Sequence, residues 1–596
     1  MKKYPIETAR HTLAHVMAYA VKQLYPDVKF GIGPVVDNGF YYDLDLDHPL
    51  NEEDFPKIEK LMQEIIAKKI DVEHRYIPVE EALKEAENEG QKYKAELLED
   101  IKSGKRMAIT DEDIEQQKDG KISFYTIGEF TDLCKGPHVE NTGDLPKDGF
   151  KLTKVAGAYW RGDEKNPQMQ RLYAVAFSSK KELGDYLVML AEAEKRDHKK
   201  LGKELGLFAF SPLVGSGLPL FLSKGEMIFH ELGKYMREEK EALGYKFVHI
   251  PHIAKTDLYE KSGHFGKYDS MMPVMTDQDG NKFVMKAMNC PHHFEIYNSE
   301  PHSYRDLPYR IAENTTVYRN EKSGELSGLV RVKALTQDDT HHFVRHDQIK
   351  SEIEMILGLT DKVYQTFNLT DYSVQISIRD PKHPEKYFGD DEVWKKSEEI
   401  LVEAVKKWGR PYVVEEGEAA FYGPKIDVMV KDSIGRKWQL TTVQLDFNQP
   451  ENFHMRYVGE DGQEHAPAVL HVAILGAIER FMGILIEHYA GAFPLWLAPV
   501  QVAVINISEN QQAWSEAVVH KLKHAGIRAE LHNQNETLGK KIRNAEVQKT
   551  PYLFVIGDKE VEAKSVAVRK RKDGDQGVIL IETAVAQLKE EIDQKK

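Results

Sequence analysis

Residues 285–345 combine side chains that could bind a metal and a nucleotide. The stretch contains Cys290, one of two cysteines in the chain, a cluster of histidines that includes His341, and the arginines Arg319 and Arg331. A thiolate and imidazoles are typical zinc ligands. Arginines on either side of a hairpin turn could bind phosphate through planar, paired hydrogen bonds. These residue types predict that metal and nucleotide chemistry meet in this stretch.

A second group of metal-ligand types lies nearer the N-terminus. His11 and His15 are spaced i, i+4 in an expected amphipathic helix at residues 7–24, so they share one face of it. Cys134 and His138 lie on either side of a Lys-Gly-Pro turn. An HxxxH pair alone more often consists of two surface or core histidines that bind no metal. Together with CxxxH it forms a four-ligand set by residue type.

The hydrophobic pattern divides the chain into parts that could position these residues. Residues 1–180 mix strand-like and helical stretches, as in an α+β domain. Residues 181–204 are helical and heavily charged, which predicts a solvated linker helix. Residues 205–497 predict an α+β core of about six antiparallel strands with helices behind them, including a strand-rich segment at 372–447. Residues 498–596 alternate strands and helices like a compact α/β domain, so the fold class is multidomain α+β.

The composition excludes several classes of protein. The 596 residues are 41% hydrophobic and 30% charged, and no apolar run approaches the ~20 residues of a membrane span. The N-terminus has no apolar signal segment, and two distant cysteines fit a reducing compartment, so we expect a cytoplasmic protein without a membrane partner. The net charge of −15 argues against a protein that coats nucleic acids without sequence preference. It still permits a local basic surface that contacts phosphates.

Several strings identify a family. Five segments carry the resemblance. The first is residues 226–251, which the pattern predicts to be a helix and a strand followed by a proline. The other four are VYRNEKSGELSGLVRVKALTQDDTHHF, HVAILGAIERFMGIL, MNCPHHF and AFYGPKID. The first three resemble motifs 1, 2 and 3 of the class II aminoacyl-tRNA synthetases. The last two are far more specific and resemble the threonyl-tRNA synthetases of the bacterial type. HTLAH, FTDLCKGPH and AGAYWRGD are similar to that family's editing domain, and GDKEVEAKSVAVRKR to its anticodon-binding domain.

The resemblance implies an activity and its partners. It implies ATP-dependent attachment of L-threonine to tRNA(Thr) through a threonyl-adenylate, with hydrolytic editing of mischarged seryl-tRNA(Thr). The editing domain would be residues 1–180, the linker helix 181–204, the catalytic domain with zinc 205–497 and the anticodon-binding domain 498–596. It also implies one Zn²⁺ per subunit, Mg²⁺ with ATP, a homodimer, and binding of the protein's own messenger as in many bacterial relatives.

The resemblance also implies the residues of the synthetic site. A P-loop is absent, so the ATP site must be built differently. The carried-over catalytic arginines are Arg319, Arg331 and Arg480. The ATP-binding set is Arg319, Glu321, Arg331, Gln337, Gln439, Thr442 and Arg480. The substrate-binding set is Met288, Asp339, Tyr422, Lys425 and Gln444. The metal set is Cys290, His341 and His471, although His292, His293 and His342 compete by residue type alone.

A zinc with three protein ligands keeps an open position for substrate. A site built to bind a hydroxyl can reject valine by as much as ~10⁴–10⁵, whereas the methyl that serine lacks is worth only ~1–3 kcal/mol. A second, hydrolytic site is therefore expected for serine. The resemblance places it at His11, His15, Asp132, Cys134 and His138, in a water-activating pocket that works without bound metal. It assigns anticodon reading to Asn535, Arg543, Glu560 and Arg569.

The sequence departs from the family pattern at a few places. Leu440-Thr441 stands where Cys-Gly is common, Val472 replaces a frequent Arg, and Lys135 replaces another. Because HTLAH starts at residue 11, we expect this protein to lack the ubiquitin-like (TGS) domain that usually precedes the editing domain in the family. One alternative is a paralogue with altered substrate or drug sensitivity. Another is an RNA-binding regulator without catalysis, against which the intact arginines and zinc-type ligands argue.

Overall fold

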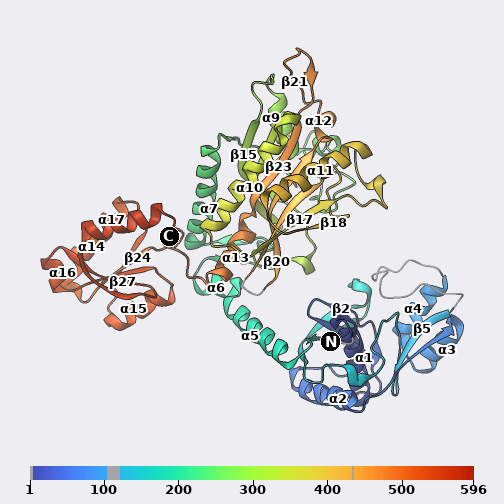
Figure 1. The fold of residues 1–596 in the computed structure, drawn as a ribbon. Coiled ribbons are helices and arrows are strands. Elements are labelled where there is room, and N and C mark those ends of the chain that lie inside the picture. Colours follow the sequence, from blue (N-terminus) through green and yellow to red (C-terminus); the bar gives the residue numbers. More distant parts are fainter. Residues whose placement is uncertain (1–3, 104–120, 433–434) are drawn as a thin grey trace. The chain divides into compact units, whose positions relative to one another are not determined.

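The computed structural model describes residues 4–103, 121–432 and 435–596 (Figure 1). The chain forms two compact units, residues 1–191 and 192–596. Within the described ranges, no helix is both long and apolar enough to cross a membrane.

The first unit packs helices against two sheets. One sheet has the order β1-β3-β8-β7, with β2 paired to β3, and the other has the order β4-β5-β6. Helix α1 runs through the core, since nearly every residue from Thr8 to Val21 is buried. The expected amphipathic helix is therefore covered on most of its surface. The elements are α1 (Ile6–Leu24), β1 (Lys29–Phe30), β2 (Val35–Val36), β3 (Gly39–Asp45), α2 (Phe55–Ala67), β4 (Val72–Pro78), α3 (Val79–Asn88), α4 (Lys92–Ser103), β5 (Lys121–Ile127), β6 (Phe130–Leu133), β7 (Phe150–Tyr159) and β8 (Gln168–Ala176).

Two helices occupy the segment where one linker helix was expected. Helix α5 (Lys180–Arg196) is followed by α6 (His198–Glu204). The break falls at Asp197, whose backbone is not helical and whose carboxylate accepts hydrogen bonds from the backbone N–H groups of Lys199 and Lys200. Such an N-cap starts a new helix. The expectation of a solvated helix is wrong for α6, because His198 and Leu201 are buried.

The second unit is built on an eight-stranded sheet with the order β11-β15-β16-β23-β20-β19-β17-β18. The pairings are antiparallel except at the edges, where β11 is parallel to β15 and β18 is parallel to β17. The strands are β11 (Lys246–Phe247), β15 (Tyr309–Tyr318), β16 (Ala334–Val344), β17 (Tyr372–Ile378), β18 (Tyr412–Glu416), β19 (Lys425–Lys431), β20 (Lys437–Asp446) and β23 (Ala468–Ala477).

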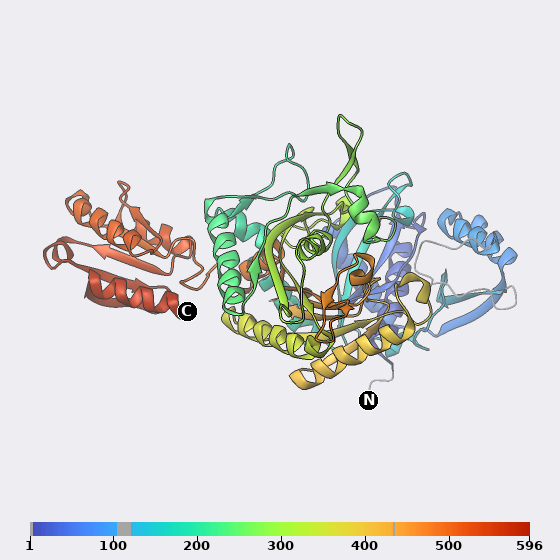
Figure 2. The same ribbon diagram turned by 90° about the horizontal axis from the view of Figure 1, so that it is seen from above.

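Helices and short strands complete this domain. Helices α10 and α13 pack on the central strands, and α10 lies beside α11 (Figures 1 and 2). The helices are α7 (Ser223–Ala242), α8 (Thr256–Lys261), α9 (Cys290–Asn298), α10 (Ile349–Thr366), α11 (Asp391–Trp408), α12 (Gln449–Asn452) and α13 (Ile478–His488). The short strands are β9 (Phe208–Ala209), β10 (Leu220–Phe221), β12 (Ile253–Lys255), β13 (Met275–Thr276), β14 (Lys282–Met285), β21 (Tyr457–Val458) and β22 (Glu464–His465).

The strand-rich segment at 372–447 also contains the 18-residue helix α11, which the sequence analysis did not anticipate. Asp390 caps its start through the N–H of Val393, and Gly409 ends it in the left-handed conformation at φ 76°. Its buried residues include Leu401 and Val405, which are one turn apart and form an apolar stripe. The capping residues of α11 and the helical spacing of its apolar residues are therefore both present in the sequence.

The C-terminal part has a five-stranded sheet with the order β25-β24-β26-β27-β28. The first three strands are parallel and the last two pair antiparallel. This confirms the expected α/β arrangement and adds the hairpin strand β28. The elements are β24 (Val502–Asn506), α14 (Gln512–His524), β25 (Ala529–His532), α15 (Leu538–Val547), β26 (Tyr552–Ile556), α16 (Asp558–Glu562), β27 (Ser565–Lys570), β28 (Gly574–Leu580) and α17 (Ile581–Asp593).

Candidate active site

A cavity of about 320 Å³ opens on the central sheet of the second unit. Every residue that the sequence analysis assigned to ATP, to the amino acid or to the metal lines it. These are Met288, Cys290, Arg319, Glu321, Arg331, Gln337, Asp339, His341, Tyr422, Lys425, Gln439, Thr442, Gln444, His471 and Arg480. Residues separated by almost 200 positions in the sequence therefore share one cavity.

The register of the sheet explains why these side chains meet. His341 on β16 is paired with His471 on β23, which is paired with Gln444 on β20, which is paired with Lys425 on β19. Residues directly opposite each other on neighbouring strands project from the same face. The four residues thus form one row across the sheet, and that row faces the cavity.

The adjoining row contains a residue that the sequence analysis did not assign. Asp427, from the string AFYGPKID, is buried and accepts hydrogen bonds from Gln439 (2.6 Å), Thr442 (3.0 Å), Ser377 (3.0 Å) and Lys425 (2.5 Å). Three of these donors line the cavity. Asp427 therefore fixes the side chains that face the ligand without lining the cavity itself.

Cys290, His341 and His471 form a group whose ligand atoms lie within 4.8 Å of one another. Nε2 of His341 is 2.9 Å from Nδ1 of His471. All three residues are buried. Burial raises the pKa of the Cys290 thiol well above its ordinary value, so a thiolate here requires a nearby cation. Burial, together with His471 and His293, lowers the pKa of His341, which leaves a neutral imidazole as a metal ligand needs. The residues fit a zinc ion.

Neighbouring side chains orient the two imidazoles. Nε2 of His471 is 3.0 Å from Oδ2 of Asp446, and Nδ1 of His341 is 2.7 Å from Nδ1 of His293. Nε2 of His293 is in turn 3.6 Å from Oε2 of Glu313. Metal-binding histidines commonly engage their second ring nitrogen in this way. The nitrogens that face each other between His341 and His471 are then the ones left to accept a metal.

The competing histidines occupy other positions. His342 follows His341 on β16 and so points to the opposite side, where its Nδ1 lies 3.0 Å from Glu352. His293 lies behind His341, and His292 is not a member of the converging group. Strand alternation alone separates His341 from His342 once β16 is known to be a strand.

Three arginines line the other end of the cavity. Arg480 donates to the backbone oxygens of Val330 (2.9 Å) and Gln439 (3.2 Å). Burial and the charges of Arg319 and Arg331 lower its pKa. Nε of Arg319 is buried and has no hydrogen-bond partner among the described residues. Clustered guanidinium groups that destabilise one another's charge favour a polyanionic ligand.

The amino-acid side of the cavity is also held by hydrogen bonds. Asn289, which the string MNCPHHF contains but which was not assigned, donates to Asp339 at 2.8 Å. The Tyr422 ring lies 5.2 Å from that of His471. Asp339 thereby presents a fixed carboxylate beside the metal-ligand group.

Of the unusual pair Leu440-Thr441, only Leu440 lines the cavity. Thr441 faces the opposite side, where its hydroxyl lies 2.8 Å from that of Tyr364 on α10 and donates to the carbonyl of Ile474. The pair therefore changes the cavity wall through one side chain.

Glu479, next to Arg480, gives a pH-dependent prediction. Burial raises the pKa of Glu479 to about 7, against an ordinary value of 4.5, although it accepts a hydrogen bond from the N–H of Thr336. The folded state thus keeps a proton that the unfolded state releases, so the free energy of unfolding falls as pH rises from about 4.5 to 7. Glu479→Gln keeps an acceptor and cannot ionise. From pH 5 to pH 8, the free energy of unfolding of this variant should rise relative to that of the parent by on the order of 3 kcal/mol. Its melting temperature should rise relative to the parent's by several degrees over the same range.

Melting curves of parent and variant at both pH values check this expectation. Glu399→Gln, at an exposed position of α11, is the matched control. If the difference in melting temperature between Glu479→Gln and the parent is the same at both pH values, Glu479 is ionised throughout and the expectation is wrong.

In the first unit, His11, His15, Cys134 and His138 converge, with ligand atoms within 4.8 Å of one another. Sγ of Cys134 is 3.1 Å from Nε2 of His11 and 3.1 Å from Nε2 of His138. Burial lowers the pKa of His15 and of His138 well below its ordinary value, so both imidazoles are neutral. Neutral imidazoles can accept a proton from water.

Asp132 joins this group with two residues that the sequence analysis missed. Its carboxylate accepts a hydrogen bond from the Tyr42 hydroxyl, forms an ion pair with Lys94 at 2.5 Å, and lies 3.9 Å from Nε2 of His15. Lys94 and Tyr42 come from α4 and β3, far from FTDLCKGPH in the sequence. Neither has a spacing pattern that ties it to the cluster.

The four residues assigned to the anticodon come from different elements of the C-terminal part. Asn535 follows β25 and Glu560 follows β26, so both lie at the carboxyl ends of parallel strands. Arg543 is exposed on α15. Arg569 is paired with Leu553, near the opposite end of β26. The Glu560 carboxylate accepts from the N–H of Gly557 and so caps α16.

Comparisons with known proteins place the chain. Residues 273–489 match the model "tRNA synthetase class II core domain (G, H, P, S and T)", residues 501–591 match "Anticodon binding domain", and residues 122–173 match "Threonyl and Alanyl tRNA synthetase second additional domain". The threonine–tRNA ligase of Deinococcus radiodurans is 49% identical over 582 residues, which are 96% of this chain and 86% of that protein. The chain belongs to the threonine–tRNA ligase family.

Other relatives agree with this membership. A threonine–tRNA ligase of Thermus thermophilus is 48% identical over 96% of this chain and 86% of its own length. A crystal structure described as the RNA binding domain of threonyl-tRNA synthetase from Cryptosporidium parvum has a TM-score of 0.64 and 32% identity, and covers 66% of this chain and 98% of that one. The family's class II core, anticodon-binding and editing domains, expected from the motifs, are thus all present, and the chain is an aminoacyl-tRNA synthetase.

Proposed function

We propose that the cavity joins L-threonine to ATP, forms threonyl-adenylate and transfers the threonyl group to tRNA(Thr). One observation carries the proposal: a Cys-His-His group and a cluster of three arginines line the same cavity. The first end suits an amino acid that has a hydroxyl group, and the second suits the phosphates of ATP. Members of this family use ATP with Mg²⁺.

The arginines would act by electrostatic stabilisation. As the carboxylate of threonine attacks the α-phosphorus, negative charge builds up on the phosphate oxygens and on the pyrophosphate that leaves. Arg319, with its unpaired Nε, and Arg480 are preorganised to receive that charge. Arg331 is held by Glu321 at 2.7 Å, so its guanidinium can reach the distal phosphates from a fixed position. Gln337, Gln439 and Thr442 complete the ATP wall.

Cys290, His341 and His471 would hold one Zn²⁺ per subunit, and the bound ion would supply an open coordination position for the amine and hydroxyl of threonine. The substrate wall is made by Met288, Asp339, Tyr422, Lys425 and Gln444. The Asp339 carboxylate, fixed by Asn289, is suited to accept a hydrogen bond from the amino group of the bound amino acid.

We assign hydrolysis of seryl-tRNA(Thr) to the His11, His15, Asp132, Cys134 and His138 cluster of the first unit. Neutral His15 and His138 can accept a proton from an attacking water, and Lys94 beside Asp132 supplies a positive charge for the oxyanion that forms. The cluster offers this chemistry from its own side chains.

The domain roles follow from the same assignments. We assign editing to residues 1–180, a linker to 181–204, synthesis to 205–497, and anticodon binding to 498–596 with Asn535, Arg543, Glu560 and Arg569. Helix α7, in the segment similar to class motif 1, is the surface through which a homodimer would form.

Aminoacylation of tRNA(Thr) transcripts with threonine, serine and valine tests the proposal. Valine should be activated ~10⁴-fold less efficiently than threonine, because it leaves a hydroxyl-binding site unpaired. Serine should be activated only about 10- to 200-fold less efficiently, and its product should be hydrolysed. A preference for serine, or activation of valine as efficient as that of threonine, would overturn the assignment.

A further inference from the structure

The loop between β15 and β16 carries Arg319, Glu321 and Arg331 into the cavity. The end of this loop is a tight turn. Ser327 and Arg331 form a β-bridge, in which the N–H of each donates to the carbonyl of the other at 3.1 and 3.2 Å. Leu329, at the tip of the turn, therefore sets the position of Arg331 two residues later.

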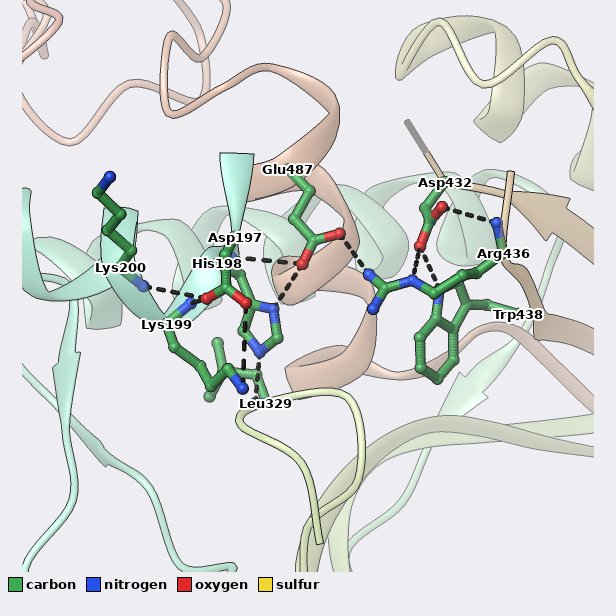
Figure 3. A network of polar contacts seen from close by, with 9 residues as sticks. All are labelled: Asp197, His198, Lys199, Lys200, Leu329, Asp432, Arg436, Trp438 and Glu487. Atoms are coloured by element: carbon green, nitrogen blue, oxygen red, sulfur yellow. Dashed lines mark hydrogen bonds and ion pairs between the residues drawn. The ribbon is translucent and has the colours of Figure 1, made fainter. Parts of the chain in front are cut away.

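His198 of α6 binds the tip of this turn (Figure 3). Its Nε2 is 3.1 Å from the backbone nitrogen of Leu329, and its Nδ1 is 2.7 Å from Oε1 of Glu487. A backbone N–H can only donate, so Nε2 accepts. The ring proton is then on Nδ1 and donates to the Glu487 carboxylate. The imidazole is buried, and these two partners fix its tautomer.

Asp197, His198 and Glu487 also have the residue types of a metal site, and their ligand atoms converge. The hydrogen bonds exclude that use. Both ring nitrogens of His198 are engaged by protein groups, and the Asp197 carboxylate caps α6 through the N–H groups of Lys199 and Lys200 (Figure 3). The cluster is a set of hydrogen bonds that orients an imidazole.

Glu487 is itself anchored, on the side away from His198. Its Oε2 accepts from Arg436 at 2.7 Å, and Arg436 donates to Asp432, which also accepts from Trp438 at 2.8 Å (Figure 3). The Arg436 guanidinium lies over the Trp438 ring at 5.3 Å. The carboxylate that orients His198 is thus tied to the β19–β20 hairpin.

Helix α13 contacts the same turn directly. Arg480 donates to the carbonyl of Val330, and a Cβ at Gly483 would lie 3.2 Å from Val330 and 3.4 Å from Leu329. The approach at Gly328 is closer still, since a Cβ there would lie 2.1 Å from Nε2 of His198, and the φ of Gly328 is +48°. The turn is held between α6 and α13 with no room for an added methyl group.

We propose that His198 is a positioning residue for ATP: it holds Leu329 so that the Ser327–Arg331 turn presents Arg331 and Glu321 to the nucleotide. The proposal rests on the proposed role of this cavity in ATP binding. It assigns a task in the synthetic reaction to α6, a segment expected from the sequence to be only a solvated linker. Threonine binding, at the other end of the cavity, does not involve this contact.

Threonine-dependent pyrophosphate exchange, with ATP and threonine varied separately, tests this role in the full-length protein. His198→Ala should raise the KM for ATP about tenfold and leave the KM for threonine within twofold, because one hydrogen bond to a buried N–H is lost. His198→Gln keeps an acceptor for Leu329 and a donor for Glu487, and should restore the KM for ATP to within about threefold of the parent. Lys203→Ala, at an exposed position of the same helix, is the matched control.

Gly328→Ala provides an independent second variant, because its methyl group would displace the imidazole from the turn. It should raise the KM for ATP as His198→Ala does. Seryl-tRNA hydrolysis by the first unit should be unchanged in both variants. An unchanged KM for ATP in His198→Ala, or equal increases in the KM values for ATP and threonine, would overturn the positioning role. Absence of exchange in the parent protein would instead overturn the proposed function.

Discussion

Cys290→Ala should abolish bound zinc and reduce threonine-dependent pyrophosphate exchange by on the order of 10³-fold or more. The two histidines that remain, His341 and His471, are buried, and their nitrogens are only 2.9 Å apart. Without the thiolate they offer a dication two ligands and no negative charge. The hydroxyl of threonine then has no partner in the cavity, and an unpaired polar group in a buried site is costly. Metal analysis of the purified variant and exchange kinetics check both parts.

The chain has two cysteines, and each provides the control for the other. Cys134→Ala removes a buried thiol of the same kind from the first unit and should keep full zinc content and full exchange activity. If Cys290→Ala keeps its exchange activity after chelation, the zinc assignment is wrong.

Cys134→Ala should in turn slow hydrolysis of seryl-tRNA(Thr) by on the order of 10²–10⁴-fold, so that mischarged tRNA accumulates. Cys134 Sγ lies 3.1 Å from Nε2 of both His11 and His138 and so helps to fix the positions of these two imidazoles. Loss of the sulfur removes one contact from each ring, which misplaces the group that accepts a proton from water. Deacylation of purified seryl-tRNA(Thr) gives the rate, and threonine charging should stay at the parent level.

His11→Ala belongs in the same series, because it removes the second partner of Cys134 and should give a comparable loss. Cys290→Ala should hydrolyse pre-formed seryl-tRNA(Thr) like the parent, since its change lies in the other unit. Unchanged deacylation in both Cys134→Ala and His11→Ala would remove the editing assignment from this cluster.

Much of the synthetic site could be predicted because its residues lie in strings with strong local patterns. Asp339 and His341 are two residues apart on β16 and so share one face, whereas His342 points to the other side; the resemblance to the family selected His341. His471 is different. It lies 130 positions from His341, and only the order of the sheet strands brings the two together. The resemblance to a family supplied that pairing, since no local spacing does.

The residues that were missed depend on contacts that are distant in the sequence. Lys94 and Tyr42 reach Asp132 from separate elements. From the sequence alone, Lys94 looks like a lysine on a helix surface and Tyr42 like a tyrosine in a strand. Asp427 was within a recognised string, but its four donors come from three strands. His198 lies in a charged segment whose burial is decided by α13 and by the loop before β16. Burial and partner identity at such positions are properties of the packed fold.

The most direct test of the account is the visible absorption spectrum of the protein with Co²⁺ in place of zinc, titrated with amino acids in the absence of ATP. Co²⁺ binds similar ligand sets, and its absorption reports coordination number and geometry. Threonine should change the spectrum, serine should change it in the same way at higher concentration, and valine should leave it unchanged. The Cys290→Ala variant should show no such spectrum. A threonine titration without spectral change, or an equal change with valine, would contradict selection of the hydroxyl group at the Cys290, His341 and His471 site.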